Sequence, residues 1–426
     1  MSTVRYFDSV PHIVRYGRHD DKKGTSWTLF YRHGVCFRIS VSLEDVSGTI
    51  FSETWLALIK KTDMHDWVKR WESLCDCVIT PCLPLLDTLA PSSHQWVTLD
   101  DYLHTPTYDL KLVRDEKETA DVVPKITEGP VDRPSYEHNL MKFSEISLLP
   151  EDIPQYPAED LVVLGKEKNW RRPPHKVRAP SGEVFFFRPC NKPARHVPTG
   201  EITNKSLDII NAYSRLHSRS TEISSLGAAE GVNIPRLQGI VVSHAYTEPE
   251  PEPEPEESAA PPPSDEGQAK LETNEPLCAG ILLNYVSRAK TLAEWMKVFT
   301  TSDLSKYKEK WKGQIAAAIR HLHDHRITVG GRSGPNAWYL INQHSVRIAN
   351  VGGDDKSERV PADIEGADKD DKGPGAGDLE GADAWLTFEG GCTVHPLMEQ
   401  EGEAEEEKFK EQKAMDWAAL EKVFQF

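Results

Sequence analysis

The stretch of sequence that most constrains the fold runs from His321 to Gly353 and reads HLHDHRITVGGRSGPNAWYLINQHSVRIANVGG. Its pattern is that of a helix end, a loop, a strand, a turn, a second strand and a glycine pair. Asn336 lies in the loop, and Asn350 follows the second strand. The fold must therefore place a helix, a loop and two short strands in close succession, with two amide side chains beside them.

The segments before this stretch predict three strands, a helix, two further strands and a long helix. The first strand lies at residues 161–164, and a Pro180-Ser181-Gly182 turn joins the next two. Helical periodicity follows at residues 202–216, and the last two strands flank a segment of alternating Glu and Pro. The long helix is indicated by apolar residues at three- and four-residue spacing: Leu304, Tyr307, Trp311, Ile315, Ala318 and Leu322.

Residues 1–120 predict a separate, small α+β domain. Apolar and polar residues alternate on both sides of His33-Gly34, which is typical of a β-hairpin. Apolar residues then recur at helical spacing from Met64 to Val78, which predicts an amphipathic helix. Residues 121–157 are polar and rich in proline, so we interpret them as a linker or a strap over the neighbouring domain.

The net charge of −17 is concentrated in three acidic tracts. Residues 248–275 hold ten acidic residues and one lysine, residues 354–383 eleven acidic and four basic residues, and residues 399–408 six acidic residues and one lysine. The rest of the chain is slightly basic, with no basic stripe, which argues against nucleic-acid binding. We expect protein partners, and the tracts to act as solubilising loops that are also suited to a basic partner.

Several features predict an intracellular protein. The N-terminus has no apolar segment of signal-peptide length, and no apolar run is long enough to span a membrane. Seven cysteines without regular spacing fit reduced thiols better than a disulfide framework. Cys75, Cys77 and Cys82 lack the spacing of a zinc site, so we interpret them as structural. We expect the cytoplasm as the location, with the nucleus as the alternative.

The order of elements from residue 155 onward, together with the His321–Gly353 stretch, resembles the protein kinase fold as found in divergent kinase-like proteins of fungi. This resemblance implies an α+β fold with a two-lobed kinase-like domain behind the small α+β N-terminal domain. The small lobe would span residues 158–288, with a disordered acidic insertion at 247–275. A degenerate large lobe would span residues 289–426, with acidic low-complexity segments at 354–383 and 399–408.

By the same resemblance, Arg188 occupies the position of the third-strand lysine that holds nucleotide phosphates. Glu201, at the start of the next helix, is the candidate for its acidic partner. A surface arginine and a first-turn glutamate favoured by the helix dipole explain the two residues equally well. Leu283, Asn284 and Tyr285 lie where the family contacts adenine.

The catalytic loop departs from the family pattern. Gly331 occupies the position of the catalytic aspartate, and Ser333 that of the catalytic-loop lysine. Asn336 is retained at one metal position, and Asn350 replaces the aspartate at the other, which removes a charge that holds a divalent cation. His323 and His325 lie just upstream as substitute bases or, in the simpler interpretation, as ordinary residues at a helix end.

These departures predict a pseudokinase that acts as a binding, regulatory or scaffold module. The alternative is an atypical ATP-dependent phosphotransferase that uses Arg188, Asn336 and Asn350 around a metal ion, so ATP and Mg²⁺ are the candidate ligands. A third hypothesis places the function in the N-terminal domain, as an interaction module, with the kinase-like part as its scaffold.

Overall fold

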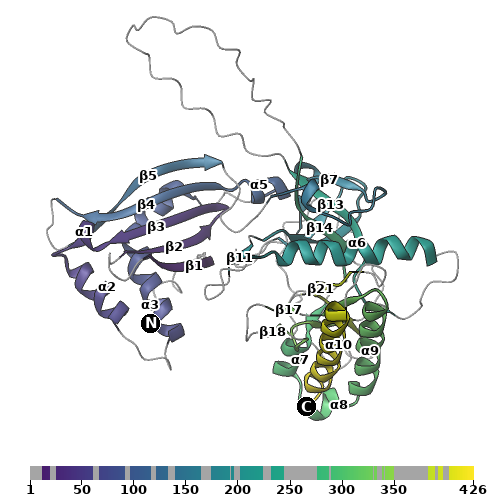
Figure 1. The fold of residues 1–426 in the computed structure, drawn as a ribbon. Coiled ribbons are helices and arrows are strands. Elements are labelled where there is room, and N and C mark those ends of the chain that lie inside the picture. Colours follow the sequence, from purple (N-terminus) through teal and green to yellow (C-terminus); the bar gives the residue numbers. More distant parts are fainter. Residues whose placement is uncertain are drawn as a thin grey trace, which may run out of the picture. The chain divides into compact units, whose positions relative to one another are not determined.

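The computed structural model describes residues 12–19, 25–60, 67–91, 96–116, 121–132, 140–164, 174–191, 193–195, 202–223, 232–243, 276–286, 289–329, 331–332, 338–339, 341–349, 382–388, 392–396 and 403–426. The chain is a mixed α and β protein with several separate sheets, in agreement with the α+β expectation (Figure 1). It divides into two compact units. The first unit comprises residues 1–142, 156–183 and 242–279, and the second comprises residues 143–155, 184–241 and 280–426.

The first unit contains a five-stranded sheet in the order β1-β2-β3-β4-β5. Its strands are β1 (His12–His19), β2 (Thr25–Arg32), β3 (Val35–Ser42), β4 (Pro106–Arg114) and β5 (Val122–Asp132). β3 and β4 are parallel, and the other neighbours are antiparallel. The predicted hairpin is confirmed: β2 and β3 are joined by His33 and Gly34, which both have positive φ, as a tight two-residue turn requires.

Helices fill the connection between the parallel strands β3 and β4. They are α1 (Leu43–Val46), α2 (Ile50–Lys60), α3 (Trp67–Ile79), η3 (Thr80–Cys82), α4 (Leu83–Leu89) and α5 (Leu99–Leu103). The amphipathic helix predicted from Met64 to Val78 corresponds to α3. Helices α1 to α3 lie on one side of the sheet (Figure 1), and their apolar residues form one core with Phe37 and Ile39 of β3. Trp55 is fully buried in this core, and burial of such a large side chain contributes about 2–3 kcal/mol.

The cysteines of this region belong to the same core. Cys75 and Cys82 are buried, and all seven cysteines of the chain are free thiols. Burial raises the pKa of Cys77 to about 11 and that of Cys82 to about 12, so both thiols stay protonated at neutral pH. These contacts agree with a structural role for the cysteines.

The first unit also holds short elements within and after the proline-rich residues 121–157. These are β6 (Met141–Lys142), β7 (Gln155–Pro157), whose first residue belongs to the second unit, η5 (Ala158–Asp160), β8 (Val162–Val163) and β9 (Lys176–Arg178). β8 and β9 are antiparallel, and β6 pairs with Leu277 and Cys278, the first residues of β14 (Leu277–Asn284). Residues 141–142 therefore add a strand beside the start of β14.

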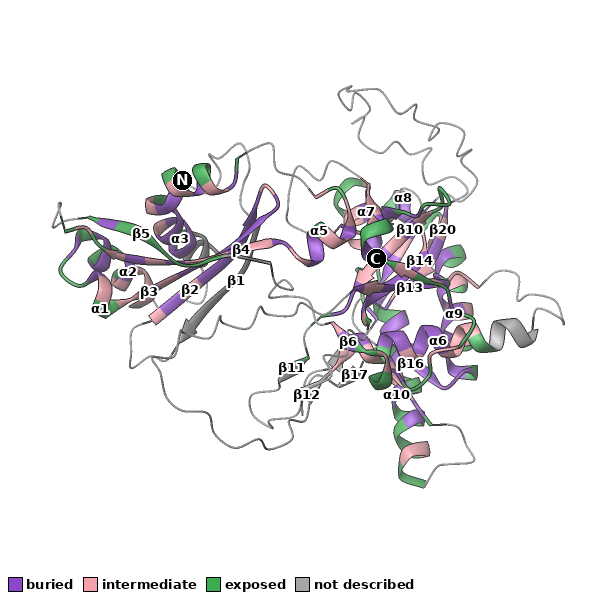
Figure 2. Ribbon diagram, turned by 90° about the horizontal axis from the view of Figure 1, so that it is seen from above, coloured by how far each residue is buried: buried purple, intermediate pink, exposed green. Residues whose placement is uncertain are grey.

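The second unit begins with three neighbouring strands and a helix. β13 (Leu237–Ser243), β14 (Leu277–Asn284) and β10 (Val184–Pro189) lie in that order in one sheet, and β13 and β14 are largely buried (Figure 2). The Glu-Pro segment is thus inserted between two neighbouring strands. η4 (Phe143–Glu145) precedes these elements, and β11 (Ala194–Arg195) pairs with β12 (Ile202–Thr203) ahead of α6 (Lys205–Ile223).

The rest of the second unit is mostly helical. Its helices are α7 (Leu292–Val298), α8 (Thr301–Ser305), α9 (Lys308–Asp324) and α10 (Glu403–Val423). Its strands form three small sheets from β15 (Lys290–Thr291), β16 (Ile327–Val329), β17 (Gly331–Arg332), β18 (Trp338–Tyr339), β19 (Val346–Ala349), β20 (Asp383–Leu386) and β21 (Cys392–Val394). α9 and α10 run side by side (Figure 1). Trp311, Ile315, Ala318 and Leu322 are fully buried, which confirms the predicted long helix from Lys308 onward. Its predicted start was wrong, because Leu304 belongs to the separate helix α8.

No helix among the described residues is long and apolar enough to cross a membrane.

Candidate functional site

Arg188 lies on β10, inside the second unit. Its guanidinium donates a hydrogen bond of 2.8 Å to the main-chain carbonyl of Phe388, which is 200 residues away in the sequence. The Phe388 ring in turn packs 4.8 Å from the ring of Tyr213 on α6. Arg188 therefore joins a strand, a helix and the segment after β20.

The groups around Arg188 stay neutral. Burial raises the pKa of the Tyr213 hydroxyl and that of the Cys392 thiol, and the positive charge of Arg188 only partly opposes the rise. The Cys392 thiol lies 3.5 Å from the carbonyl oxygen of Asp208, to which it can donate. A thiol with a raised pKa is a poor nucleophile, so Cys392 is a packing residue here.

The residues expected to contact adenine take part in strand pairing. Leu283 is buried and lies opposite Phe186 in the β10–β14 ladder. The amide of Asn284 donates to the carbonyl of Arg236 at 3.1 Å, and its side-chain oxygen accepts the amide of Arg236. Tyr285 follows and is half-buried. Both the main chain and the side chain of Asn284 are thus used within the protein.

The structure places only part of the predicted catalytic loop. Gly331 lies in β17, opposite Tyr339, and as a glycine it offers no acid or base. Glu201, Ser333, Asn336 and Asn350 lie outside the described residues. Arg188, Leu283 and Asn284 come from the neighbouring strands β10 and β14.

A buried pair of a histidine and an aspartate, which local sequence patterns did not predict, lies at the end of α9. His323 Nε2 and Asp416 Oδ2 are 2.9 Å apart, and each side chain is 1% exposed. The same carboxylate oxygen accepts the amide of Val329 at 3.0 Å. Burial raises the pKa of Asp416, and the hydrogen bonds from His323 and Val329 oppose that rise. Asp416 therefore fixes both the end of α9 and the end of β16.

Gln412, one turn before Asp416 on α10, is the centre of a second buried polar network. Gln412 Oε1 lies 2.9 Å from His395 Nε2 and accepts the Thr328 hydroxyl at 2.8 Å. Because an amide oxygen only accepts, His395 carries its proton on Nε2 in this arrangement. Burial lowers the pKa of His395 to about 4, with nearby Lys408 and Arg326 adding to the effect. The histidine is therefore neutral at physiological pH.

Two arginines tie the surrounding segments together. Arg326 has a positive φ of 56°, donates to the carbonyl of Pro396 at 2.8 Å, and pairs with Glu406 at 3.0 Å. Its guanidinium also lies 4.3 Å from the centre of the Phe409 ring. Arg215 on α6 donates to the carbonyl of His395 at 2.6 Å. α6, the end of α9, β21 and α10 are thus held by one polar interior.

His323 and His325 take the simpler of their two expected roles. His325 ends α9, and its Nδ1 lies 2.7 Å from the carbonyl of His321. The rings of His323 and Trp417 are roughly perpendicular, with centroids 5.9 Å apart, and His323 is closed to solvent. The sequence does carry a signal for Asp416. It lies four residues after Gln412 and four before Leu420, so the three residues share one face of α10.

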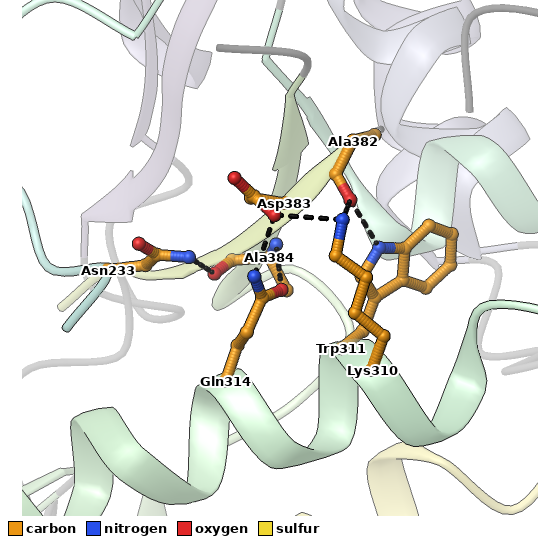
Figure 3. A network of polar contacts seen from close by, with 7 residues as sticks. All are labelled: Asn233, Lys310, Trp311, Gln314, Ala382, Asp383 and Ala384. Carbon is orange, nitrogen blue, oxygen red and sulfur yellow. Dashed lines mark hydrogen bonds and ion pairs between the residues drawn. The ribbon is translucent and has the colours of Figure 1, made fainter. Parts of the chain in front are cut away.

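A third network holds the chain where it returns after the second acidic tract (Figure 3). Asp383 lies opposite Ala349 in the β19–β20 ladder, so the two ends of residues 350–382 are adjacent. Lys310 pairs with Asp383 at 2.9 Å, and Lys310 and Trp311 both donate to the carbonyl of Ala382. Gln314 accepts the amide of Ala384 and donates to Asp383, and Asn233 donates to the Ala384 carbonyl. α9 thereby anchors β20.

The chemistry available in these networks is limited to holding structure. Within the part of the chain that the structure describes, no three His, Cys, Asp or Glu side chains are grouped closely enough to hold a metal ion. The His323–Asp416 pair has the composition of an acid–base pair, but at 1% exposure it is closed to a dissolved substrate. The geometry fits a rigid interior better than a reaction centre.

The neutral state of His395 predicts a pH dependence of stability. An unfolded histidine has a pKa near 6.5, whereas the pKa of His395 is lowered to about 4, so the stabilisation is present above pH 6.5 and is lost as the pH falls toward 4. Between pH 7 and pH 5, we expect a loss of about 2 kcal/mol in unfolding free energy from this residue. Urea unfolding followed by tryptophan fluorescence at both pH values measures it.

The His395→Asn variant should lose most of that difference between pH 7 and pH 5. His344 is exposed and serves as the matched control, since His344→Asn should keep the full difference. An unchanged pH dependence in His395→Asn would contradict the assignment.

No protein-family model matches the chain, and no curated protein matches it either.

Proposed function

We propose that this protein is a catalytically impaired protein-kinase-like protein, a pseudokinase, that acts as a binding, regulatory or scaffold module. The order of elements along the chain supports the kinase-like assignment. Three strands (β8, β9 and β10) and the short β11–β12 pair precede α6, two more strands (β13 and β14) follow it, and a helical region with α9 comes next. This is the order of the small lobe and the start of the large lobe in the kinase family.

The observation that carries the proposal is the contact of Arg188. In an active kinase, the cation on the third strand holds nucleotide phosphates. Here the guanidinium is bound to the carbonyl of Phe388 at 2.8 Å, and its planar fork is a poor substitute for a lysine ammonium. The residues present therefore do not fit ATP in the way the family binds it.

The catalytic loop supports the same conclusion. Gly331 has no side chain to accept a proton from a hydroxyl group. General-base assistance is worth roughly a hundred- to ten-thousand-fold in rate. Asn284, in the segment expected to contact adenine, already has its amide and side-chain oxygen bonded to Arg236. A role in binding a protein partner requires none of these groups.

Arg188 variants test the proposal. We expect Arg188→Ala to lower the free energy of unfolding by about 1–3 kcal/mol, because the buried Phe388 carbonyl loses a charged donor. Arg320→Ala, on the exposed face of α9, should change it by less than about 0.5 kcal/mol. ATP with or without Mg²⁺ should not change the melting temperature of the wild-type protein.

The contrary outcome is equally measurable. A ligand at a hundred times its dissociation constant stabilises the native state by about 2.7 kcal/mol, which a thermal-shift titration detects. A magnesium-dependent ATP shift that disappears in both Arg188→Ala and Asn336→Ala, together with phosphotransfer to a protein substrate, would overturn the proposal in favour of an active phosphotransferase.

A further inference from the structure

Two histidines lie side by side at the end of α9. His321 and His325 are four residues apart, and among the 16 histidines of the chain no other pair has this spacing. Residues four apart are neighbours on the surface of a helix. The centroids of the two imidazole rings are 4.4 Å apart, with 47° between the ring planes. The spacing in the sequence is therefore matched by a contact in the structure.

The main chain fixes the tautomer of His325. Its Nδ1 lies 2.7 Å from the carbonyl oxygen of His321. Because a carbonyl oxygen only accepts, Nδ1 carries the proton of the neutral imidazole, and Nε2 has a lone pair. Within the described part of the chain, no other hydrogen bond uses the Nε2 of His325 or the ring nitrogens of His321. Histidines that bind metals commonly donate from one ring nitrogen to a carbonyl and coordinate the ion with the other.

The separation of the two rings suits a shared metal ion. With Zn–N distances of about 2.0–2.1 Å and tetrahedral angles, the ring centres of two coordinating histidines lie about 5 Å apart. The observed 4.4 Å is shorter by about half an ångström, which a small rotation of the half-buried His321 side chain supplies. His325 is only 6% exposed, so an ion would approach from the side of His321.

The charges beside the pair do not oppose a cation. Asp324 is exposed and lies three residues after His321, on the same face of the helix, so its carboxylate adds negative charge there. Arg326 is paired with a carboxylate of α10 at 3.0 Å. Arg215 donates to the main-chain carbonyl of His325 at 3.3 Å, away from the ring nitrogens.

We propose that His321 and His325 form a two-histidine site for a first-row transition-metal ion such as Zn²⁺ or Cu²⁺. Imidazole nitrogen suits these ions, whereas Mg²⁺ and Ca²⁺ take oxygen ligands. Among the described residues, no third His, Cys, Asp or Glu is close enough to complete the site, so water molecules take the remaining positions. The bound ion would fix the last turn of α9, which Arg215 joins to α6. The inference stands independently of the kinase-like proposal.

Titration calorimetry of the untagged, full-length protein with Zn²⁺ at neutral pH tests the site. Single histidines elsewhere also bind Zn²⁺ weakly, so the readout is the difference between variants at the tightest site. A second ligand on the same helical turn acts at a high effective concentration, so His321→Asn and His325→Asn should each weaken that site roughly 100-fold. Asparagine at position 325 keeps a side-chain N–H for the His321 carbonyl and removes Nε2. Mg²⁺ should not compete with Zn²⁺ for the site.

The double variant distinguishes one shared ion from two separate sites. If both rings bind the same ion, the double variant should bind no more weakly than either single variant, because either change already removes the chelate. His344 is exposed, so His344→Asn is the matched control and should keep the wild-type affinity. The melting temperature of each variant without metal checks that it is folded. An unchanged Zn²⁺ affinity in either single variant, losses that add in the double variant, or competition by Mg²⁺ would overturn the proposal.

Discussion

The Asp416→Ala variant should lower the free energy of unfolding by about 3–5 kcal/mol, because two buried donors lose their acceptor and each unsatisfied buried donor costs about 1–3 kcal/mol. The carboxylate of Asp416 is bound to His323 at 2.9 Å and to the amide of Val329 at 3.0 Å. Its removal leaves both donors without this acceptor in a site that is closed to water. Urea unfolding at neutral pH measures the loss.

The same helix offers a matched control. Glu421 on α10 pairs with Lys312 at 2.7 Å but is 61% exposed, so Glu421→Ala should cost less than about 1 kcal/mol. The double variant His323→Leu with Asp416→Leu should be more stable than Asp416→Ala, because apolar residues of similar volume remove both polar groups together. A cost for Asp416→Ala no greater than that for Glu421→Ala would contradict the structural role of the pair.

The periodic parts of the fold were predictable from the sequence. The hairpin around His33 and Gly34 follows from alternation and a turn signal, and α9 follows from apolar residues at three- and four-residue spacing. The sequence also predicts that the Glu-Pro segment is an insertion between two strands, because alternating Glu and Pro residues have no apolar side chains to bury in a core. The strands on its two sides, β13 and β14, are neighbours in one sheet. In each case the information is local, within one turn or one helix.

The contacts that define the candidate site were not predictable in that way. Arg188 reaches a carbonyl 200 residues away, and Asp416 reaches a histidine 93 residues away. The helical phase of α10 marks Asp416 as an inward-facing carboxylate, but the identity of its partner depends on how α9 and α10 meet. The expected pairing of Arg188 with Glu201 stays a prediction, since Glu201 lies outside the described residues.

Polar contacts, rather than apolar burial alone, therefore determine how the segments of the second unit fit together. Arg188 joins β10 to the segment after β20, and Asp416 joins α10 to α9 and β16. A protein that holds a partner needs a fixed surface, and buried polar pairs add orientation to packing because only one arrangement satisfies them. The proposed scaffold role fits this arrangement, because Arg188 and Asp416 both bond within the protein.

The Gly280→Ala variant should destabilise the protein by about 3 kcal/mol, because the new methyl group has no space. Gly280 lies opposite Pro189 where β14 meets β10. A Cβ there would be 2.3 Å from the carbonyl oxygen of Arg188 and 2.7 Å from the ring of Phe187. Main-chain atoms in a ladder cannot retreat, so β10 must shift and carry Arg188 away from Phe388.

Gly313→Ala is the matched control, because the same added methyl group has free space there. Urea unfolding of both variants measures the two changes in unfolding free energy. Gly313 lies on the exposed side of α9, and a Cβ there meets nothing within 4 Å. Glycine inside a helix is less favourable than alanine by roughly 0.5–1 kcal/mol, so this substitution should stabilise the protein by about that amount. The same chemical change should therefore have opposite signs at the two glycines. If Gly280→Ala were as harmless as Gly313→Ala, β10 and β14 would not approach as closely as described, and the position of Arg188 beside Phe388 would lose its main support.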